Sequence, residues 1–209
     1  MNTRDAYNNW AIQYDTNKNQ TRDLEGISLK TLLEDINYET CLEIGCGTGK
    51  NTSWLMLKGN EVISVDFSEA MLEKAKEKIN DDKVKFIHAN ILEEWQFVSS
   101  KVDVVVFSLV LEHIESLETI FFKVREVVKV GGFVYVGELH PFKQYSGSKA
   151  RFETAEGTQV LECFTHHFSE YIDAAYTAGL RIVRCKEFFD EDNRATIPRI
   201  LGLLFEKID

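Results

Sequence analysis

Short apolar runs rich in β-branched residues alternate along the chain with longer segments in which apolar residues recur at helical spacing. Runs that are apolar throughout indicate strands of a sheet that is covered on both faces. The runs are CLEIGC (41–46), EVISVDF (61–67), VKFIHAN (84–90), VDVVVFSLV (102–110) and GGFVYVGEL (131–139). Strands that alternate with helices in this way predict a parallel α/β sheet with right-handed crossovers.

The segments between these runs carry helix signals. Ser68 is suited to cap a helix, and an apolar stripe over residues 117–128 stops at the glycine pair 131–132. A further helix is predicted from about Ser169 to Ala178, before Gly179. These signals place helices between the predicted strands.

Two more apolar runs lie near the end of the chain, LRIVRCKEFF (180–189) and IPRILGLLFEKI (197–208). The connection between them, residues 190–196, is short and polar, which predicts an antiparallel hairpin. With the five earlier runs, the sequence predicts a mostly parallel sheet of seven strands that ends in an antiparallel hairpin.

The length and composition are those of one globular domain. The 209 residues contain no stretch rich enough in Pro, Ser or Gly to read as an interdomain linker. No apolar run approaches the roughly 18 residues needed to span a bilayer, and the polar beginning MNTRDAYNNW has no signal-peptide core. We therefore expect a cytoplasmic protein without membrane insertion.

The net charge and the cysteine content limit the classes of partner and metal site to expect. The net charge of −10 opposes nonspecific binding to nucleic acid, so small molecules are the expected partners. The four cysteines, at 41, 46, 163 and 185, are widely spaced and form no C-x-x-C pair. We expect no metal site and interpret the cysteines as buried free thiols.

Three glycines crowd into LEIGCGTGK (42–50), at the point where the first strand must turn into its helix. A ligand at this turn would meet bare backbone and a helix N-terminus. Asp66 ends the next strand, in the position from which a carboxylate can bind both hydroxyls of a ribose. The two features together predict a nucleoside ligand, with a helix-capping Asp66 beside a tight turn as the alternative.

The glycine spacing disfavours a dinucleotide. The fingerprint G-x-G-x-x-G would need glycine at position 50, where the chain has Lys50, and no G-x-x-x-x-G-K-[ST] loop is present. The remaining candidate is a nucleoside whose tail lacks a pyrophosphate.

These motifs resemble those of the class I S-adenosylmethionine-dependent methyltransferases, and most closely the small-molecule branch that acts on ubiquinone precursors. The similar segments are LEIGCGTGK (42–50), VISVDFSEAML (62–72), VKFIHANILE (84–93), VDVVVFSLVLEHI (102–114) and FFKVREVVKVGGFVYVGE (121–138). The resemblance implies a Rossmann-like, doubly wound α/β fold, S-adenosyl-L-methionine as cofactor and S-adenosyl-L-homocysteine as product. It also implies N-terminal cap helices over 1–38, a cofactor-binding core over 39–139, a substrate-side insert over 140–167 and a C-terminal helix with hairpin over 168–209.

The resemblance also implies a cofactor site. The backbone of the glycine turn would pass under the methionyl part, Asp66 would hold the ribose, and the third strand would meet the adenine edge. Met71 could instead be helix core, Phe67 a hydrophobic staple, and Asn90 a strand end. The implied cofactor residues are Tyr14, Gly45, Cys46, Gly47, Asp66, Phe67, Met71, Ala89, Asn90, Ile91, Ser108 and Leu109.

A sulfonium is already an activated methyl donor, so a base is needed only when the acceptor must lose a proton. His140 follows the fifth strand, at the edge where open α/β sheets bind ligands, and is the first candidate for this role. His113 is the second candidate, with a structural role as the alternative.

The segments outside the common scaffold are expected to cover the acceptor. The insert over 140–167 is long for a connection, and we expect Phe142, Tyr145, Lys149 and Arg151 within it to bind the substrate, with a solvated loop as the alternative. These aromatic and cationic side chains suit a modest, anionic organic acceptor.

The sequence leaves three functions open. A small-molecule methyltransferase is favoured over a noncatalytic module that binds S-adenosylmethionine and over a nucleotide-dependent oxidoreductase. The acceptor and its reacting atom stay open, as does the choice between monomer and homodimer.

Overall fold

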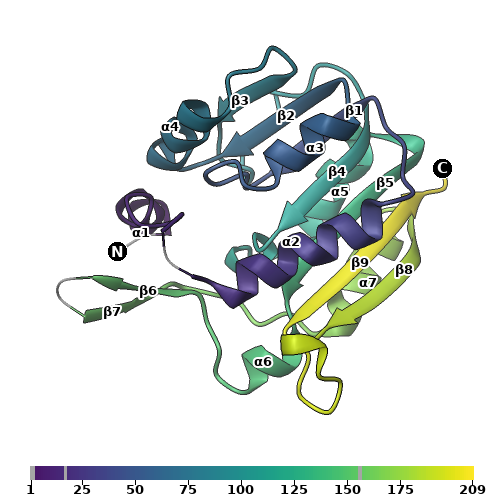
Figure 1. Ribbon diagram of the computed structural model, residues 1–209. Coiled ribbons are helices and arrows are strands. Elements are labelled where there is room, and N and C mark those ends of the chain that lie inside the picture. Colours follow the sequence, from purple (N-terminus) through teal and green to yellow (C-terminus); the bar gives the residue numbers. More distant parts are fainter. Residues whose placement is uncertain (1–2, 17, 155–156) are drawn as a thin grey trace.

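The computed structural model describes residues 3–16, 18–154 and 157–209. A seven-stranded sheet with the order β3-β2-β1-β4-β5-β9-β8 runs through the molecule, and β6 and β7 form a separate two-stranded sheet (Figure 1). The strands of the large sheet are β1 (Thr40–Ile44), β2 (Glu61–Asp66), β3 (Val84–His88), β4 (Val102–Ser108), β5 (Val128–Leu139), β8 (Leu180–Phe188) and β9 (Ile200–Lys207).

The helices fall between the strands, as the periodicity predicts. They are α1 (Thr3–Trp10), α2 (Gln20–Leu33), α3 (Thr52–Lys58), α4 (Glu69–Lys78), α5 (Leu117–Val127), α6 (Pro141–Tyr145) and α7 (Phe168–Thr177), with the short 3-10 turns η1 (Leu111–His113) and η2 (Asp190–Asp192). Ser68 caps α4, because its hydroxyl accepts a hydrogen bond from the backbone N–H of Met71.

The predicted sheet is confirmed. Strands β1 to β5 are parallel, and β9 is antiparallel to both of its neighbours, β5 and β8. Strand β8 follows α7 directly and pairs with β9 across the short connection that contains η2. The fold is therefore a Rossmann-like α/β sheet with one reversed strand.

Alternate residues of the central strands enter two different cores. In β4, Val105 and Phe107 pack on the face covered by α5 and α7, whereas Val104 and Val106 pack on the face covered by α2 and α3. Figure 1 shows α2 crossing in front of the strands, with α5 and α7 behind them. Burial on both faces explains why this strand is apolar throughout.

Helix α1 lies apart from the sheet, between α4 and the β6–β7 hairpin (Figure 1). Ala6 and Trp10 of α1 pack with Met71 of α4 and with Leu161, which follows β7. This small apolar cluster holds the N-terminal segment above the carboxyl ends of the strands.

Three details differ from the sequence-based expectations. Helix α5 ends at Val127, and β5 begins at Val128 rather than at Gly131, because Val128 already pairs with Val102 beyond an irregularity in the register. The insert contains α6, β6 (Arg151–Thr154) and β7 (Gly157–Val160) rather than only loop. Among the cysteines, Cys41 and Cys46 are buried, but Cys163 is half-buried and Cys185 is exposed.

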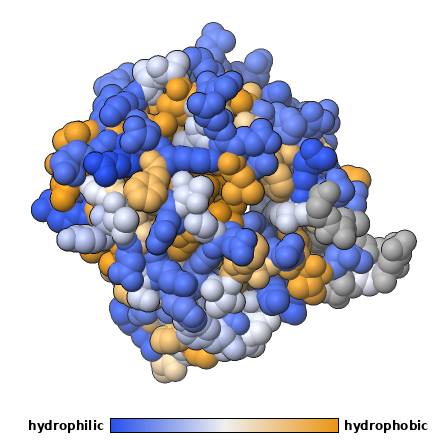
Figure 2. All heavy atoms as spheres, turned by 180° about the vertical axis from the view of Figure 1, so that it is seen from behind, coloured by the Kyte–Doolittle hydropathy of each residue, from blue (hydrophilic) through white to orange (hydrophobic). Residues whose placement is uncertain are grey.

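Seen from behind, the surface is largely hydrophilic, and hydrophobic residues reach it in small separate groups (Figure 2). Among the helices of the described ranges, none has both the length and the apolarity needed to cross a bilayer.

Candidate functional site

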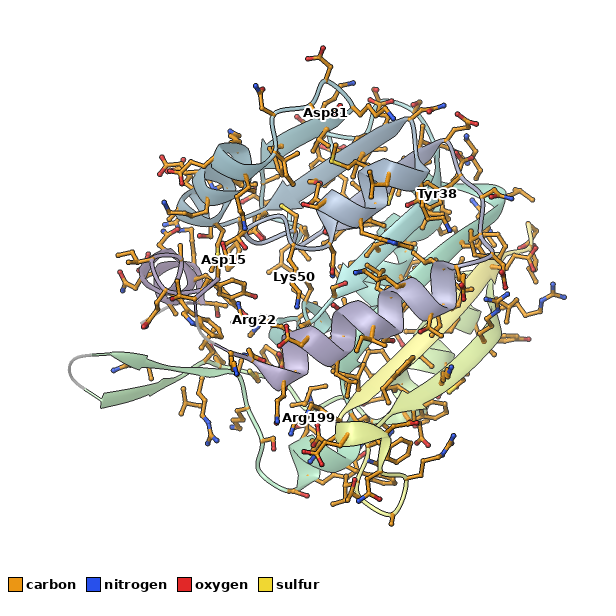
Figure 3. All side chains as sticks on the ribbon, viewed as in Figure 1. Asp15, Arg22, Tyr38, Lys50, Asp81 and Arg199 are labelled. Atoms are coloured by element: carbon orange, nitrogen blue, oxygen red, sulfur yellow. The ribbon has the colours of Figure 1, made fainter. Side chains whose placement is uncertain are left out.

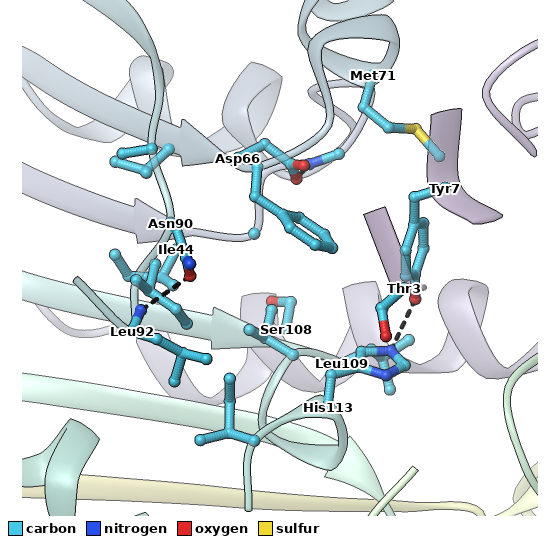
Figure 4. A pocket seen from close by; sticks show the side chains of 18 of the residues that line it. Thr3, Tyr7, Ile44, Asp66, Met71, Asn90, Leu92, Ser108, Leu109 and His113 are labelled. Carbon is cyan, nitrogen blue, oxygen red and sulfur yellow. Dashed lines mark hydrogen bonds between the residues drawn. The ribbon is translucent and has the colours of Figure 1, made fainter. Parts of the chain in front are cut away.

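A cavity of about 240 Å³ opens at the carboxyl ends of β1, β2 and β4, below α1 (Figure 4). Open α/β sheets bind their ligands at this edge. It is lined by Thr3, Tyr7, Tyr14, Ile44, Gly45, Gly47, Val65, Asp66, Phe67, Met71, Ala89, Asn90, Ile91, Leu92, Ser108, Leu109, Val110, His113 and Ile114. We call it the donor cavity. Eleven of the twelve residues assigned to the cofactor line this cavity, and the exception is Cys46. His113 lines it too.

Gly45 and Gly47 of the glycine turn are needed for different reasons. Gly45 and Gly47 have φ of 73° and 54°, in the left-handed region that favours glycine. A Cβ at Gly45 would lie 2.2 Å from the Val110 side chain, so this glycine makes room for the protein itself. A Cβ at Gly47 would have only Tyr14 within 4 Å, at 3.9 Å, and Gly47 therefore presents open backbone to the cavity.

Asp66 faces the cavity and also fixes its floor. Its carboxylate accepts hydrogen bonds from the backbone N–H groups of Gly47, at 2.8 Å, and Ser68, at 2.9 Å. Burial raises the pKa of Asp66, against the effect of these backbone hydrogen bonds. Each carboxylate oxygen can accept about two hydrogen bonds, so each retains capacity for a ligand hydroxyl.

The third strand supplies the far wall of the donor cavity. Asn90 follows β3, and its side-chain carbonyl accepts a hydrogen bond from the backbone N–H of Leu92 at 3.0 Å. Met71 is buried in the apolar cluster beneath α1 and also lines the cavity, so it serves the core and the site together. This wall is mostly apolar, as a flat aromatic ligand requires.

Ser108 and Leu109 form the wall at the end of β4. The Ser108 hydroxyl accepts a hydrogen bond at 3.1 Å from the Asn51 amide, which also donates to the buried Glu25 of α2 at 3.0 Å. Leu109 has φ of 58°, a conformation that non-glycine residues rarely adopt. Strain of this kind collects at functional sites.

The N-terminal segment closes the donor cavity through a hydrogen bond between Tyr7 and His113, drawn as a dashed line in Figure 4. The Tyr7 hydroxyl lies 2.9 Å from Nε2 of His113, and Nδ1 of His113 lies 3.1 Å from the Glu162 carbonyl oxygen. Burial lowers the pKa of His113, so the ring is neutral near pH 7. Both nitrogens are engaged, which indicates a structural role.

His140 lies outside the donor cavity. Its Nδ1 accepts a hydrogen bond from the backbone N–H of Phe142 at 3.2 Å, so the ring caps α6, and its Nε2 lies 3.1 Å from Glu187. Phe142 and Tyr145 are on exposed positions of α6, and the Tyr145 hydroxyl lies 2.7 Å from Nδ1 of His167. None of these three sequence-predicted residues lines the donor cavity.

A second cavity, also of about 240 Å³, adjoins the first, and Tyr7, Tyr14 and Leu109 line both. Its walls come from α1, α2, the carboxyl ends of β4 and β5, and the insert. The lining residues are Tyr7, Trp10, Tyr14, Asn19, Thr21, Arg22, Leu109, Glu112, Leu139, Ser148, Lys149, Ala150, Arg151 and Arg199. We call it the neighbouring cavity. It includes two of the residues predicted to bind substrate, Lys149 and Arg151.

Glu112, His113 and Cys163 each offer one ligand atom, and these atoms lie within 4.8 Å of one another. Two observations argue against a metal there. Both nitrogens of His113 already have partners, and burial raises the pKa of Cys163 to about 12, whereas a metal requires the thiolate. We interpret the group as a structural cluster around the hydrogen-bonded ring of His113.

Several lining residues escape the sequence analysis. Thr3, Arg22 and Arg199 lie far from the glycine motif in the chain and reach the cavities only through the packing of α1, α2 and β9. Glu112 lies within the segment 102–114, but its sequence neighbours do not reveal that its side chain is buried. No local spacing signal marks these positions.

A glycine turn that faces a carboxylate at the carboxyl edge of a parallel sheet is the arrangement with which Rossmann-like folds bind nucleosides. Comparisons with known proteins find methyltransferases among the similar chains and structures. Residues 42–136 match the family model described as a methyltransferase domain. A malonyl-[acyl-carrier protein] O-methyltransferase of Hamiltonella defensa is 27% identical over 85% of this chain and 67% of that protein.

Solved structures share the fold. A structure described as a putative S-adenosylmethionine-dependent methyltransferase from Listeria monocytogenes superposes with a TM-score of 0.76 at 22% identity, over 90% of this chain and 99% of that one. The N-methyltransferase NodS from Bradyrhizobium japonicum, solved with S-adenosyl-L-homocysteine, gives 0.75 at 16% identity over all of both chains. The chain therefore shares the fold of solved S-adenosylmethionine-dependent methyltransferases, and its central region matches the methyltransferase-domain model. Its alignments span 41% to 77% of the length of the first four curated relatives.

Proposed function

We propose that this protein binds S-adenosyl-L-methionine in the donor cavity and transfers its methyl group to a small-molecule acceptor. The observation that carries the proposal is the meeting of Asp66 with the open backbone of Gly47 in one cavity. The spare acceptor capacity of Asp66 suits the two ribose hydroxyls. The apolar wall from Ala89 to Leu92 suits the adenine.

The remaining assignments follow from the order of the residues around the cavity. Phe67 and Met71 would flank the adenine, and the glycine turn would lie under the methionyl part. Tyr14, Ser108 and Leu109 would surround the sulfonium, at the boundary with the neighbouring cavity. Cys46 would contribute only backbone, because its side chain is buried and its N–H donates to the Val65 carbonyl at 3.0 Å.

The bound cofactor supplies an electrophilic methyl group on a positively charged sulfur. The protein's own contribution is to align the two reactants in line and to exclude water, and such positioning can supply about 7 kcal/mol or more of the barrier. The N-terminal segment excludes water through the Tyr7–His113 hydrogen bond. No group of the chain needs to form a covalent bond with the methyl group.

Two measurements test the proposal separately. Calorimetry with S-adenosylmethionine and S-adenosylhomocysteine should give one site of micromolar affinity. A screen of small metabolites for release of S-adenosylhomocysteine should identify the acceptor. Binding without turnover of any acceptor would favour a noncatalytic module, and absence of binding would refute the assignment of the donor cavity.

A further inference from the structure

The neighbouring cavity has an unusual charge for this protein. Four basic side chains, those of Arg22, Lys149, Arg151 and Arg199, line it together with one carboxyl group, that of Glu112. The whole chain carries a net charge of −10. A local excess of positive charge in an acidic protein indicates a site for an anionic group.

The four cations differ in how far the protein neutralises them. Arg199 forms a two-point ion pair with Asp190, with nitrogen–oxygen distances of 2.5 and 2.7 Å. Arg22 lies over the ring of Tyr14, with Cζ 3.9 Å from its centroid, and donates to the Tyr14 carbonyl. Figure 3 shows Arg22 and Arg199 beside the N-terminal end of α2.

Among the side chains that the structure describes, Lys149 and Arg151 have no such partner, and neither forms an ion pair. Lys143, in the same insert, lies 3.6 Å from Asp190 and outside the cavity, so it is a paired cation of the same segment. The positive charge available to a ligand therefore comes chiefly from Lys149 and Arg151.

A second observation points to a ligand in the same cavity. Glu112 is buried, and its Oε2 accepts no hydrogen bond from any described residue. A buried polar atom without a partner is costly, and a ligand donor would satisfy it. The cavity thus offers cations on the side of the insert and α2, and a hydrogen-bond acceptor on the side of η1.

We propose that the neighbouring cavity binds the methyl acceptor and that this acceptor carries a carboxylate or phosphate group, held by Lys149 and Arg151, and a hydrogen-bond donor directed at Glu112. The proposal rests on the proposed function, because it places the acceptor across Tyr14 and Leu109 from the donor. The acceptor's lone pair forms the bond to the methyl carbon as the carbon–sulfur bond breaks, and the electron pair of that bond stays on sulfur.

Matched pairs of small probes test the charge of the acceptor. Benzoate against benzamide, and phenyl phosphate against phenol, are titrated into the protein by calorimetry at low salt, with and without S-adenosylhomocysteine. We expect at least one anion to bind tenfold or more tightly than its neutral counterpart, and this preference to shrink with added salt. The two pairs distinguish a carboxylate site from a phosphate site.

Variants locate the site. The double variant Lys149→Gln/Arg151→Gln should reduce the preference for the anion at least fivefold while its affinity for S-adenosylhomocysteine stays within twofold, which also shows that it is folded. The matched control Lys143→Gln should keep the preference. Equal binding of each anion and its neutral counterpart, or a preference that survives in the double variant, would overturn the proposal. If the wild type did not bind S-adenosylhomocysteine, the donor assignment would be refuted instead. The two failures can be told apart, because the probes are also measured without S-adenosylhomocysteine.

Discussion

The carboxylate of Asp66 accepts a hydrogen bond from the backbone N–H of Gly47 across 2.8 Å, so the residue assigned to the ribose also holds the glycine turn in place. The two residues come from the ends of neighbouring parallel strands. Any change at Asp66 therefore acts on the floor of the donor cavity as well as on the ligand.

The first prediction concerns this double role. Asp66→Ala should weaken the binding of S-adenosylhomocysteine by about 1 to 3 kcal/mol, because it removes charge-assisted hydrogen bonds to the ribose. It should also lower the free energy of unfolding, because the N–H groups of Gly47 and Ser68 lose their acceptor. Calorimetry and chemical denaturation measure the two effects.

Asp103→Ala is the matched control for stability. Asp103 lies at the opposite end of the strands and accepts hydrogen bonds from Thr40 and Lys129, which outweigh burial and lower its pKa to about 2. The variant should be destabilised with unchanged ligand affinity. Equal affinity of Asp66→Ala and the wild type would remove Asp66 from the ligand site.

The second prediction separates two glycines of the same turn. Gly45→Ala should destabilise the protein by more than the roughly 1 to 2 kcal/mol that a positive φ costs, because its Cβ would clash with Val110. Adding Val110→Ala should recover the excess. Gly47→Ala should cost only the strain, yet lose ligand affinity.

Gly147→Ala provides the reference for strain alone, since Gly147 has φ of 87° and nothing within 4 Å of an added Cβ. Thermal unfolding with and without S-adenosylhomocysteine distinguishes the variants. If Gly47→Ala bound the ligand as well as Gly147→Ala does, the ligand would not approach this backbone.

Local patterns in the sequence determine much of this fold and of the donor cavity. The strands that are apolar on both faces, the Ser68 cap and the glycine turn each depend on neighbours in the chain, and the structure contains all of them. Gly45 has a second reason that the sequence does not reveal, because it accommodates the Val110 side chain as well as lining the cavity. That contact joins two strands and leaves no trace in the spacing.

The acceptor side could be predicted only in part. Lys149 and Arg151 line the neighbouring cavity, but Phe142 and Tyr145 point elsewhere because the insert folds into α6 and a hairpin rather than into a loop. Arg22 reaches the same cavity from α2, which lies more than a hundred residues before the insert in the chain. Such placements depend on tertiary packing, which no local pattern encodes.

The third prediction concerns the closure of the donor cavity. Tyr7→Phe removes the hydroxyl that bonds to His113 and should weaken S-adenosylhomocysteine binding by about 1 kcal/mol, roughly fivefold. It should also speed amide hydrogen exchange in α1. Tyr176→Phe, on an exposed position of α7, is the control and should change neither quantity. Unaltered exchange in Tyr7→Phe would show that this bond does not hold α1.

The fourth prediction is a fall in stability with rising pH. Burial raises the pKa of Glu138 to about 8 and that of Glu112 to about 7, and the charge of Glu112 adds to the rise at Glu138. The folded state therefore retains protons that the unfolded state releases above about pH 4.5, so the free energy of unfolding decreases from about pH 4.5 to pH 8.

Glu138→Gln tests this slope. The amide oxygen of glutamine can still accept the N–H groups of Val110 and Leu111, while the titrating proton is gone. We expect the variant to lose a large part of the pH dependence, on the order of 3 kcal/mol between pH 5 and pH 8. The other titratable groups near this carboxyl group are Tyr171, Glu112 and, through Glu112, Tyr7 and Cys163. A slope identical to that of the wild type would show that Glu138 is ionised in the folded protein.

The last prediction concerns His140, the first candidate for a base. Its ring caps α6 through Nδ1 and meets Glu187 through Nε2, it is almost fully buried, and burial lowers its pKa despite the nearby carboxylate. We therefore expect His140→Ala to cost about 1 to 2 kcal/mol of stability, as the loss of a helix cap does. With the acceptor present, the rate at which His140→Ala releases S-adenosylhomocysteine should stay within twofold of the wild-type rate.

The pH profile decides between the two roles of His140. If His140 is a base, the pH profile of the rate shows an ionisation near neutrality, and His140→Ala abolishes that ionisation. If His140 is only a cap, variant and wild type have profiles of the same shape. Glu187→Gln is the companion variant, since it removes the partner of Nε2 and leaves the ring in place. If the ring is only a cap, this variant should keep the profile too, because the loss of a structural hydrogen bond changes stability and not proton transfer. A profile altered in both variants would instead mean that the ring reaches the acceptor and that Glu187 sets its protonation.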